Sequence, residues 1–83
     1  DQEDADAWYY IGFIYNQTNN YEQAVIALTK VIGMEADAGD AYFERGIAWF
    51  NLMKDEDACT DWSEGILIGN EMCKKMYDAE CVQ

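Results

Sequence analysis

The side chains most able to do chemistry in this chain are its three cysteines. Cys59, Cys73 and Cys81 show no CxxC spacing, so the sequence alone does not fix whether, or how, they pair. A disulfide needs an oxidising compartment, and the alternative is that the thiols are buried and pack as small apolar groups. The redox state of the cysteines therefore stays open at this level.

A second candidate is the acidic stretch DAGDAYFE, which holds Asp37, Asp40 and Glu44. Carboxylates are calcium ligands, but these lack the alternating ligand spacing and the bidentate glutamate of a calcium loop. Helix capping explains the stretch better, because Asp accepts backbone N–H bonds at a helix start and Gly39 suits a turn. We expect an Asp N-cap there and no metal.

The composition removes several classes of enzyme. The chain has no histidine, so Ser-His-Asp and Cys-His arrangements and histidine-containing zinc signatures are impossible. No Gly-rich phosphate loop is present either, and the six glycines fall at packing or turn positions instead. We expect a protein that is not an enzyme and that needs no cofactor.

Charge and hydropathy restrict the partners. Seventeen acidic residues against five basic ones give a net charge of −12, which repels nucleic acids and anionic membrane surfaces and favours a cationic partner. The alternative is that the acidic residues only solvate the outer faces of helices. Because no apolar run approaches the ~18 residues of a membrane span, we expect a soluble protein, cytoplasmic or periplasmic.

The elements that must position these residues follow from a repeat. An offset of 34 residues aligns bulky with bulky and small with small side chains: Trp8 with Tyr42, Gly12 with Gly46, Tyr15 with Trp49, Ala24 with Ala58, and Leu28 with Trp62. Within each unit the apolar residues follow helical spacing, and Ile11 belongs to the first such stripe. The pattern predicts five helices, at about 5–18, 21–34, 40–52, 55–68 and 71–81, each antiparallel to its neighbours.

The two breaks inside the units differ. NQTNN offers Asn19 and Asn20, and asparagine tolerates the left-handed backbone that a tight turn between helices often needs. The matching stretch LMKDED has Met53 and Lys54, which are poorer turn residues. We therefore expect the second turn to be more strained or longer than the first.

These residues resemble the tetratricopeptide repeat (TPR) family, since AWYYIGFIY and AYFERGIAW both fit its run of aromatic, aliphatic, Gly and aromatic residues. The resemblance implies an all-α, right-handed superhelix within one domain, 1–83, with repeats at 5–38 and 39–72 and a capping helix at about 71–81. It also suggests a bacterial origin. Arg45 departs from the family, which usually has an aliphatic residue there. The residues to which the resemblance gives a packing role are Trp8, Gly12, Tyr15, Ala24, Tyr42, Gly46, Trp49 and Ala58.

The resemblance also implies a function, because the concave face of the family commonly holds an extended peptide or a helix of a partner. On this face we expect an apolar strip made of Tyr9, Phe13, Phe43, Ile47 and Phe50. Its edges carry Asp6, Tyr10, Asp40 and Glu44. Such a strip predicts a protein or peptide partner with apolar anchors beside Lys or Arg. The alternative is a structural piece of a longer array, or a homodimer, whose apolar face is an internal contact. The predicted peptide-binding residues are Tyr9, Phe13, Asn16, Gln17, Asp40, Phe43, Glu44, Ile47, Phe50 and Asn51.

A cysteine pairing follows from the same resemblance. Some bacterial members look similar at ACTDWSEGILIGN, with one cysteine at the start of the last second helix and another at the end of the cap. Cys59 and Cys81 stand at these places, so they form the possible disulfide, and Cys73 is then the odd thiol.

Overall fold

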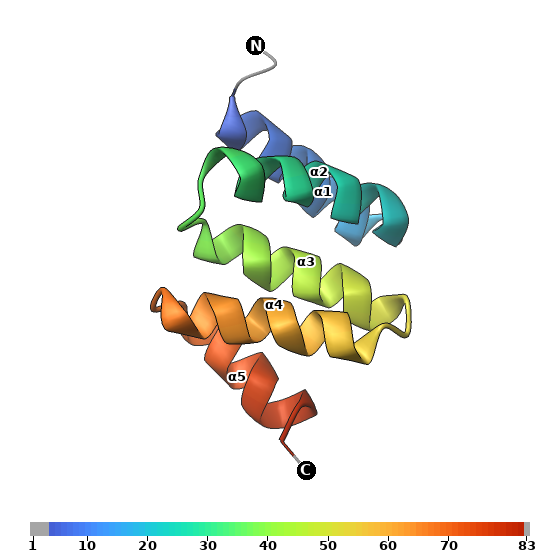
Figure 1. Ribbon diagram of the computed structural model, residues 1–83. Helices are drawn as coiled ribbons and strands as arrows, with labels where there is room; N and C mark the ends of the chain where they lie inside the picture. The colour runs from blue at the N-terminus through green and yellow to red at the C-terminus, as the bar shows by residue number, and fades with distance from the viewer. Residues whose placement is uncertain (1–3, 83) are drawn as a thin grey trace.

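The computed structural model describes residues 4–82, and all their regular structure is helical. The helices are α1 (Ala5–Gln17), α2 (Tyr21–Met34), α3 (Gly39–Asn51), α4 (Asp55–Leu67) and α5 (Glu71–Glu80). Figure 1 shows them following one another from the N-terminal to the C-terminal end of the molecule. The all-α prediction is confirmed, and the predicted helices agree with the observed ones to within one residue at each end.

Consecutive helices pack on each other, and α3 also contacts both α1 and α5. Two layers result, with α1, α3 and α5 in one and α2 and α4 in the other. The described chain is elongated, with principal extents of 42 × 26 × 16 Å. Because each element touches mainly its neighbours along the stack, stability is distributed as in a helical repeat protein.

The first core lies where α2 meets α1 and α3. Leu28 is fully buried there together with Ala41 and Ala48 of α3. Gly12 of α1 faces Leu28 so closely that an added Cβ would come within 2.6 Å of the leucine Cγ. The glycine therefore permits the close approach of α1 and α2. Trp8 and Tyr15, which have predicted packing roles, are partly buried against this core.

The second core repeats this arrangement with larger side chains. Ala58 and Trp62 of α4 are fully buried beside Cys73 of α5. A Cβ on Gly46 would overlap the Trp62 indole, as one on Gly12 would overlap Leu28. Gly65 similarly leaves room for the Cys73 side chain, so a glycine that weakens the helix is needed for the cap to dock.

The α1–α2 and α3–α4 turns have the same length, so of the two expected alternatives the second turn is the more strained one and not the longer one. Asn19 and Met53 both adopt a left-handed backbone with φ of 65°. Each is followed by a matching bond, from Asn20 N to Tyr15 O at 2.8 Å and from Lys54 N to Trp49 O at 2.9 Å. The second turn is not longer, because these bonds to the preceding helix fix its length and force Met53 into an unfavourable region.

The start of α3 is also different from the expectation. Its N-cap position is Ala38, without a side-chain cap bond, so no Asp caps this helix. Asn70 instead connects the α4–α5 turn to α3, because its Nδ2 donates to Asp40 Oδ1 at 3.1 Å. Its Oδ1 accepts from Cys73 N at 2.8 Å and caps α5. One amide therefore joins α5 to α3.

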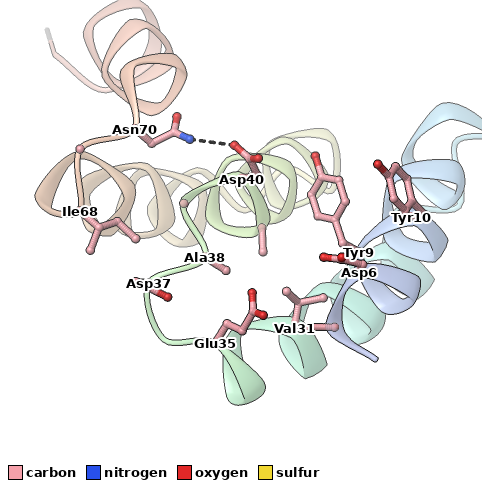
Figure 2. A pocket seen from close by; sticks show the side chains of 14 residues that line it. Asp6, Tyr9, Tyr10, Val31, Glu35, Asp37, Ala38, Asp40, Ile68 and Asn70 are labelled. Carbon is pink, nitrogen blue, oxygen red and sulfur yellow. Dashed lines mark hydrogen bonds between the residues drawn. The ribbon is translucent and has the colours of Figure 1, made fainter. Parts of the chain in front are cut away.

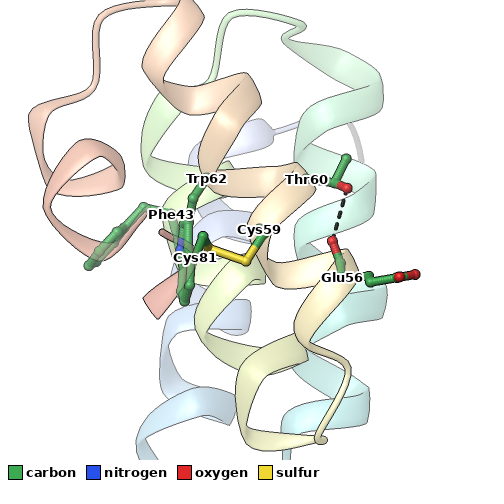
Figure 3. Close-up of a disulfide and its surroundings, with 6 residues drawn as sticks. All are labelled: Phe43, Glu56, Cys59, Thr60, Trp62 and Cys81. Atoms are coloured by element: carbon green, nitrogen blue, oxygen red, sulfur yellow. Dashed lines mark hydrogen bonds between the residues drawn. A yellow bond between two sulfur atoms is a disulfide. The ribbon is translucent and has the colours of Figure 1, made fainter. Parts of the chain in front are cut away.

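A disulfide between Cys59 and Cys81 joins α4 to the end of α5, with a Cα–Cα distance of 5.8 Å (Figure 3). The bond lies beside Trp62 and Phe43 of the second core. Cys73 is a free thiol and is buried. The capping helix is therefore held by packing, by Asn70 and by a covalent bond.

Candidate functional site

The predicted binding residues come from α1 and α3, which lie in the same layer, and we name the surface they form the α1/α3 face. The structure divides the predicted residues into three groups. Phe13, Gln17, Asp40 and Asn51 are exposed. Tyr9, Phe43, Ile47 and Phe50 are partly buried, and Asn16 and Glu44 are buried.

The apolar strip is less continuous than the sequence suggested. Three of its residues, Phe43, Ile47 and Phe50, are partly buried and pack against the second core. The ring centroids of Phe50 and Trp62 are 6.0 Å apart. The Trp62 indole also donates to the carbonyl oxygen of Phe43 at 3.2 Å. The α3 part of the strip therefore also stabilises the fold, while Phe13 of α1 remains 36 % exposed.

Asn16 and Glu44 face each other between α1 and α3. The Nδ2 of Asn16 donates to both the Oε1 and the backbone oxygen of Glu44, each at 3.0 Å. Both residues are only 7 % exposed. Burial raises the pKa of the Glu44 carboxyl, and the bond from Asn16 partly opposes this. These two residues join the repeats and are not available at the surface as the sequence had suggested.

A pocket of about 460 Å³ opens at one end of the α1/α3 face, where α1 and α3 begin (Figure 2). We call it the acidic pocket. Asp6 and Asp40 come from the two helices, and Glu35 and Asp37 from the loop after α2. Tyr9 and Tyr10 lie together at one side, and Asn70 and small or aliphatic residues complete the lining. None of the described residues that line it is basic.

The two tyrosines contribute aromatic surface to the acidic pocket. Their rings meet edge to face, with centroids 5.5 Å apart. Burial, together with Glu44, Asp40 and Tyr10, raises the pKa of Tyr9 to about 12. Its hydroxyl therefore stays protonated at neutral pH. Carboxylates beside aromatic rings suit an ammonium or guanidinium group, which gains both charge pairing and contact with a ring face.

Arg45 is not part of this site. Its Nε and Nη2 donate to the two Asp61 carboxylate oxygens at 2.7 Å each, and its Nη1 donates to Thr29 Oγ1 at 3.0 Å. Hydrogen bonding to Asp61 raises the pKa of Arg45 above its ordinary value, although burial acts in the opposite direction. The residue that departs from the family pattern thus neutralises a buried aspartate and connects α2, α3 and α4.

The buried thiol and the acidic side chains are the remaining candidates for chemistry. Burial, with Asp61 and Asp40, raises the pKa of the Cys73 thiol to about 11, so it is not a thiolate at neutral pH. Among residues 4–82 there is no group of three or more Asp, Glu, Cys or His side chains arranged to hold a metal ion.

Sequence reasoning found the helices of the site but missed several lining residues. Glu35, Ile68 and Asn70 line the acidic pocket from loops far apart in the sequence. Helical periodicity does not mark these loop residues, because their place in the pocket depends on how the helices pack. Asn70, for example, lies between α4 and α5, and its amide reaches Asp40 in the first turn of α3.

No helix among residues 4–82 is long and apolar enough to cross a membrane.

Of three comparisons with known proteins, one gave a match. Searches of curated proteins and of solved structures gave no match. The family model of the tetratricopeptide repeat matches residues 6–34, which contain nearly all of α1 and α2. The match supports a TPR-like repeat there and, in general terms, a module for protein interaction.

Proposed function

We propose that this protein is an interaction module that binds an extended or helical peptide on its α1/α3 face, with an apolar anchor near Phe13 and a basic residue in the acidic pocket. The observation that carries the proposal is the adjacency of these two features. Tyr9 lines the pocket, and Phe13 lies one helical turn further along α1, about 6 Å away along the axis. A ligand with Lys or Arg one or two residues from an apolar side chain would reach both.

The charge of the chain supports the same partner. The net charge is −12, and four carboxylates surround one concavity. A basic segment would be attracted over distances comparable to the Debye length, about 8 Å at physiological salt. Affinity should therefore fall with ionic strength, while the apolar anchor should provide a contribution that depends little on salt.

The proposal is tested by selecting displayed random peptides against the purified protein. We expect a consensus that combines Lys or Arg with a large apolar residue. The Phe13→Ala variant should bind these peptides about 5- to 100-fold more weakly, as truncated aromatic anchors usually do. Phe13 is the better target than Phe43, because Phe43 packs on the second core and its loss would also weaken the fold.

Two further variants complete the design. Leu67→Ala removes an exposed apolar side chain of α4 that does not line the acidic pocket, so it should bind like the parent protein. Asp6→Asn combined with Glu35→Gln should weaken binding and flatten its dependence on salt. Equal enrichment on the parent and on Phe13→Ala would refute the proposal and favour a structural piece of a longer array.

A further inference from the structure

The acidic pocket is bounded on one side by the turn that leads into α5. Ile68, Gly69 and Asn70, the residues between α4 and α5, all line it. Figure 2 shows Ile68 and Asn70 on one side of the pocket and Tyr9 and Tyr10 on the other. One wall of the pocket therefore belongs to this turn, and its place depends on how α5 is held.

The start of α5 lies on the start of α3, which supplies Asp40 to the acidic pocket. Asn70 Nδ2 donates to Asp40 Oδ1 at 3.1 Å, while Asn70 Oδ1 accepts from Cys73 N at 2.8 Å. A Cβ on Gly39 would come within 3.1 Å of the Asn70 Cβ, so the two segments are closely packed there. The Asp40 carboxylate is therefore oriented by a side chain that also caps α5.

Packing and a covalent bond hold α5 in this place. The helix has 10 residues, too few to be stable by itself. Cys73 is fully buried, and Met76 and Tyr77 are partly buried against the second core. The disulfide from Cys59 to Cys81 fixes the opposite end of the helix to α4. Removing that bond should therefore lower the fraction of molecules in which the first turn of α5 lies on α3.

A small dithiol can reach the disulfide. Cys59 and Cys81 are both partly exposed, and a cavity of about 270 Å³ opens at Cys59. The dithiol attacks one sulfur as a thiolate, forms a mixed disulfide and then closes on itself. It passes two electrons and two protons to the protein, which then holds free thiols at Cys59 and Cys81, and it leaves as a cyclic disulfide. Cys73 takes no part, because it is buried.

We propose that the disulfide controls the acidic pocket through α5. With the bond intact, Asn70 stays on Asp40 and this wall of the pocket is in place. Reduction by a dithiol releases α5 from α3, so Asp40 loses its partner and the pocket opens to water. A basic ligand then binds more weakly, because the carboxylate must be ordered at the moment of binding. The effect on ligands rests on the proposed function, whereas the release of Asn70 does not.

The affinity of one defined probe in the two redox states tests the effect on ligands. The probe is a synthetic peptide in which one glycine separates arginine from leucine, and its twin has citrulline, an uncharged isostere, in place of arginine. Dithiothreitol should weaken binding of the arginine peptide about 2- to 10-fold, the factor that ordering one side chain is worth. The citrulline peptide should bind the oxidised and reduced protein alike, since it makes no ion pair in the pocket.

Three variants separate the bond from the wall. Cys59→Ser combined with Cys81→Ser should bind like the reduced parent protein, with or without dithiothreitol. Asn70→Ser still caps α5, but its shorter side chain does not reach Asp40. It should bind the arginine peptide weakly with the disulfide intact and respond little to reduction. Asn20→Ser, the matched change at the N-cap of α2 and outside the acidic pocket, should respond to reduction like the parent protein.

A measurement without ligand separates this inference from the proposed function. In nitrogen–proton NMR correlation spectra, the side-chain amide of Asn70 and the backbone amide of Asp40 should shift on reduction, whereas the side-chain amide of Asn20 should not. If these shifts occur while neither peptide binds in either redox state, the proposed function is refuted and the control of the pocket by the disulfide is supported.

Any of four results would overturn the proposal. The first is that the amides of Asn70 and Asp40 do not shift on reduction. The second is tighter binding of the arginine peptide to the reduced protein. The third is an equal loss of affinity for the arginine and citrulline peptides, which would mean that reduction loosens the whole α1/α3 face. The fourth is equal affinity of Asn70→Ser and the oxidised parent protein, a comparison that holds even if the reduced protein unfolds.

Discussion

The helix pairs α1–α2 and α3–α4 place different side chains at equivalent positions, and the difference shows how one helical hairpin can be stabilised in two ways. Leu28 fills the first core opposite Gly12, and Trp62 fills the second opposite Gly46. The first pair combines Leu28 and Val31 with the partly buried rings of Trp8 and Tyr15. The second adds a Trp62 hydrogen bond, the buried pair of Arg45 with Asp61, and the disulfide to α5.

Because the two cores differ in their largest side chain, they should also differ in how much stability a single truncation removes. Leu28 and Trp62 are the largest fully buried side chains of the two cores, and truncating Trp62 removes more buried surface than truncating Leu28. The α3–α4 pair also holds α5, and a 10-residue helix is too short to be stable by itself. The disulfide and the Asn70 bonds therefore lie where they fix α5.

Truncation of the dominant side chain should have the largest effect. Trp62→Ala should lower the free energy of unfolding by about 3 to 5 kcal/mol, because it leaves a cavity and removes the contact with Gly46. Leu28→Ala, the equivalent change in the first repeat, falls in the range of about 2 to 5 kcal/mol and should cost less. Urea denaturation followed by circular dichroism measures both. A smaller loss for Trp62→Ala than for Leu28→Ala would contradict the comparison.

Reduction of the disulfide should act on the second repeat alone. The bond closes a loop with a sequence separation of 22, for which chain entropy gives a stabilisation of about 3 kcal/mol. Dithiothreitol should lower the urea midpoint, and hydrogen exchange should increase in α5 and α4 before α1 and α2. The Cys59→Ser, Cys81→Ser double variant controls for the reductant and should not respond to it. An unchanged midpoint of the parent protein would show that packing alone holds α5.

The two turns allow a smaller and reciprocal test. Met53 and Asn19 share a φ of 65°, and the Met53 side chain is 87 % exposed, so replacing it costs little packing. Met53→Asn should stabilise the protein by about 1 kcal/mol or less, because asparagine tolerates the left-handed region better. Asn19→Met should destabilise it by a similar amount. If both substitutions change the urea midpoint in the same direction, backbone strain is not the cause.

Periodicity in the sequence predicts where the helices lie, but not which of their faces are covered. Helical spacing and the 34-residue offset were sufficient for the helices, because both depend on local structure and on repetition. Ile11 was assigned to the core because spacing identifies an apolar stripe without showing whether a helix covers it. The second turn was expected to be more strained or longer, and it is strained rather than longer, because backbone bonds fix its length and Met53 adopts a positive φ.

The polar contacts between helices could not be predicted from periodicity, because they depend on how the helices pack. Asn16 and Glu44 look like surface residues in the sequence and are buried only because α1 and α3 meet there. Arg45 and Asp61 are 16 positions apart on different helices, and their pairing depends on how α3 and α4 cross. The acidic pocket combines two helix starts and two loops, so its lining required the tertiary structure.

Glu44 provides the smallest of the effects and a test of the contact between the repeats. Its pKa in the folded protein is raised by burial above the ordinary value of 4.5. A raised pKa means that the folded state binds the proton more tightly than the unfolded state does. The resulting stabilisation is present below that ordinary value and is lost as the pH rises through the higher folded value. At neutral pH the ionised carboxylate is therefore a cost to the joint between α1 and α3.

Glu44→Gln should remove this cost, because the glutamine oxygen can still accept from Asn16 without being charged. We expect the variant to be more stable than the parent protein at neutral pH by less than about 1 kcal/mol, and the difference to shrink as the pH falls towards the ordinary glutamate value. Glu64→Gln, an exposed site on α4, changes the net charge equally and should show no such trend. Urea midpoints measured across this range decide the matter. If Glu44→Gln is less stable than the parent at neutral pH, the ionised carboxylate strengthens the contact between the repeats more than its burial weakens it.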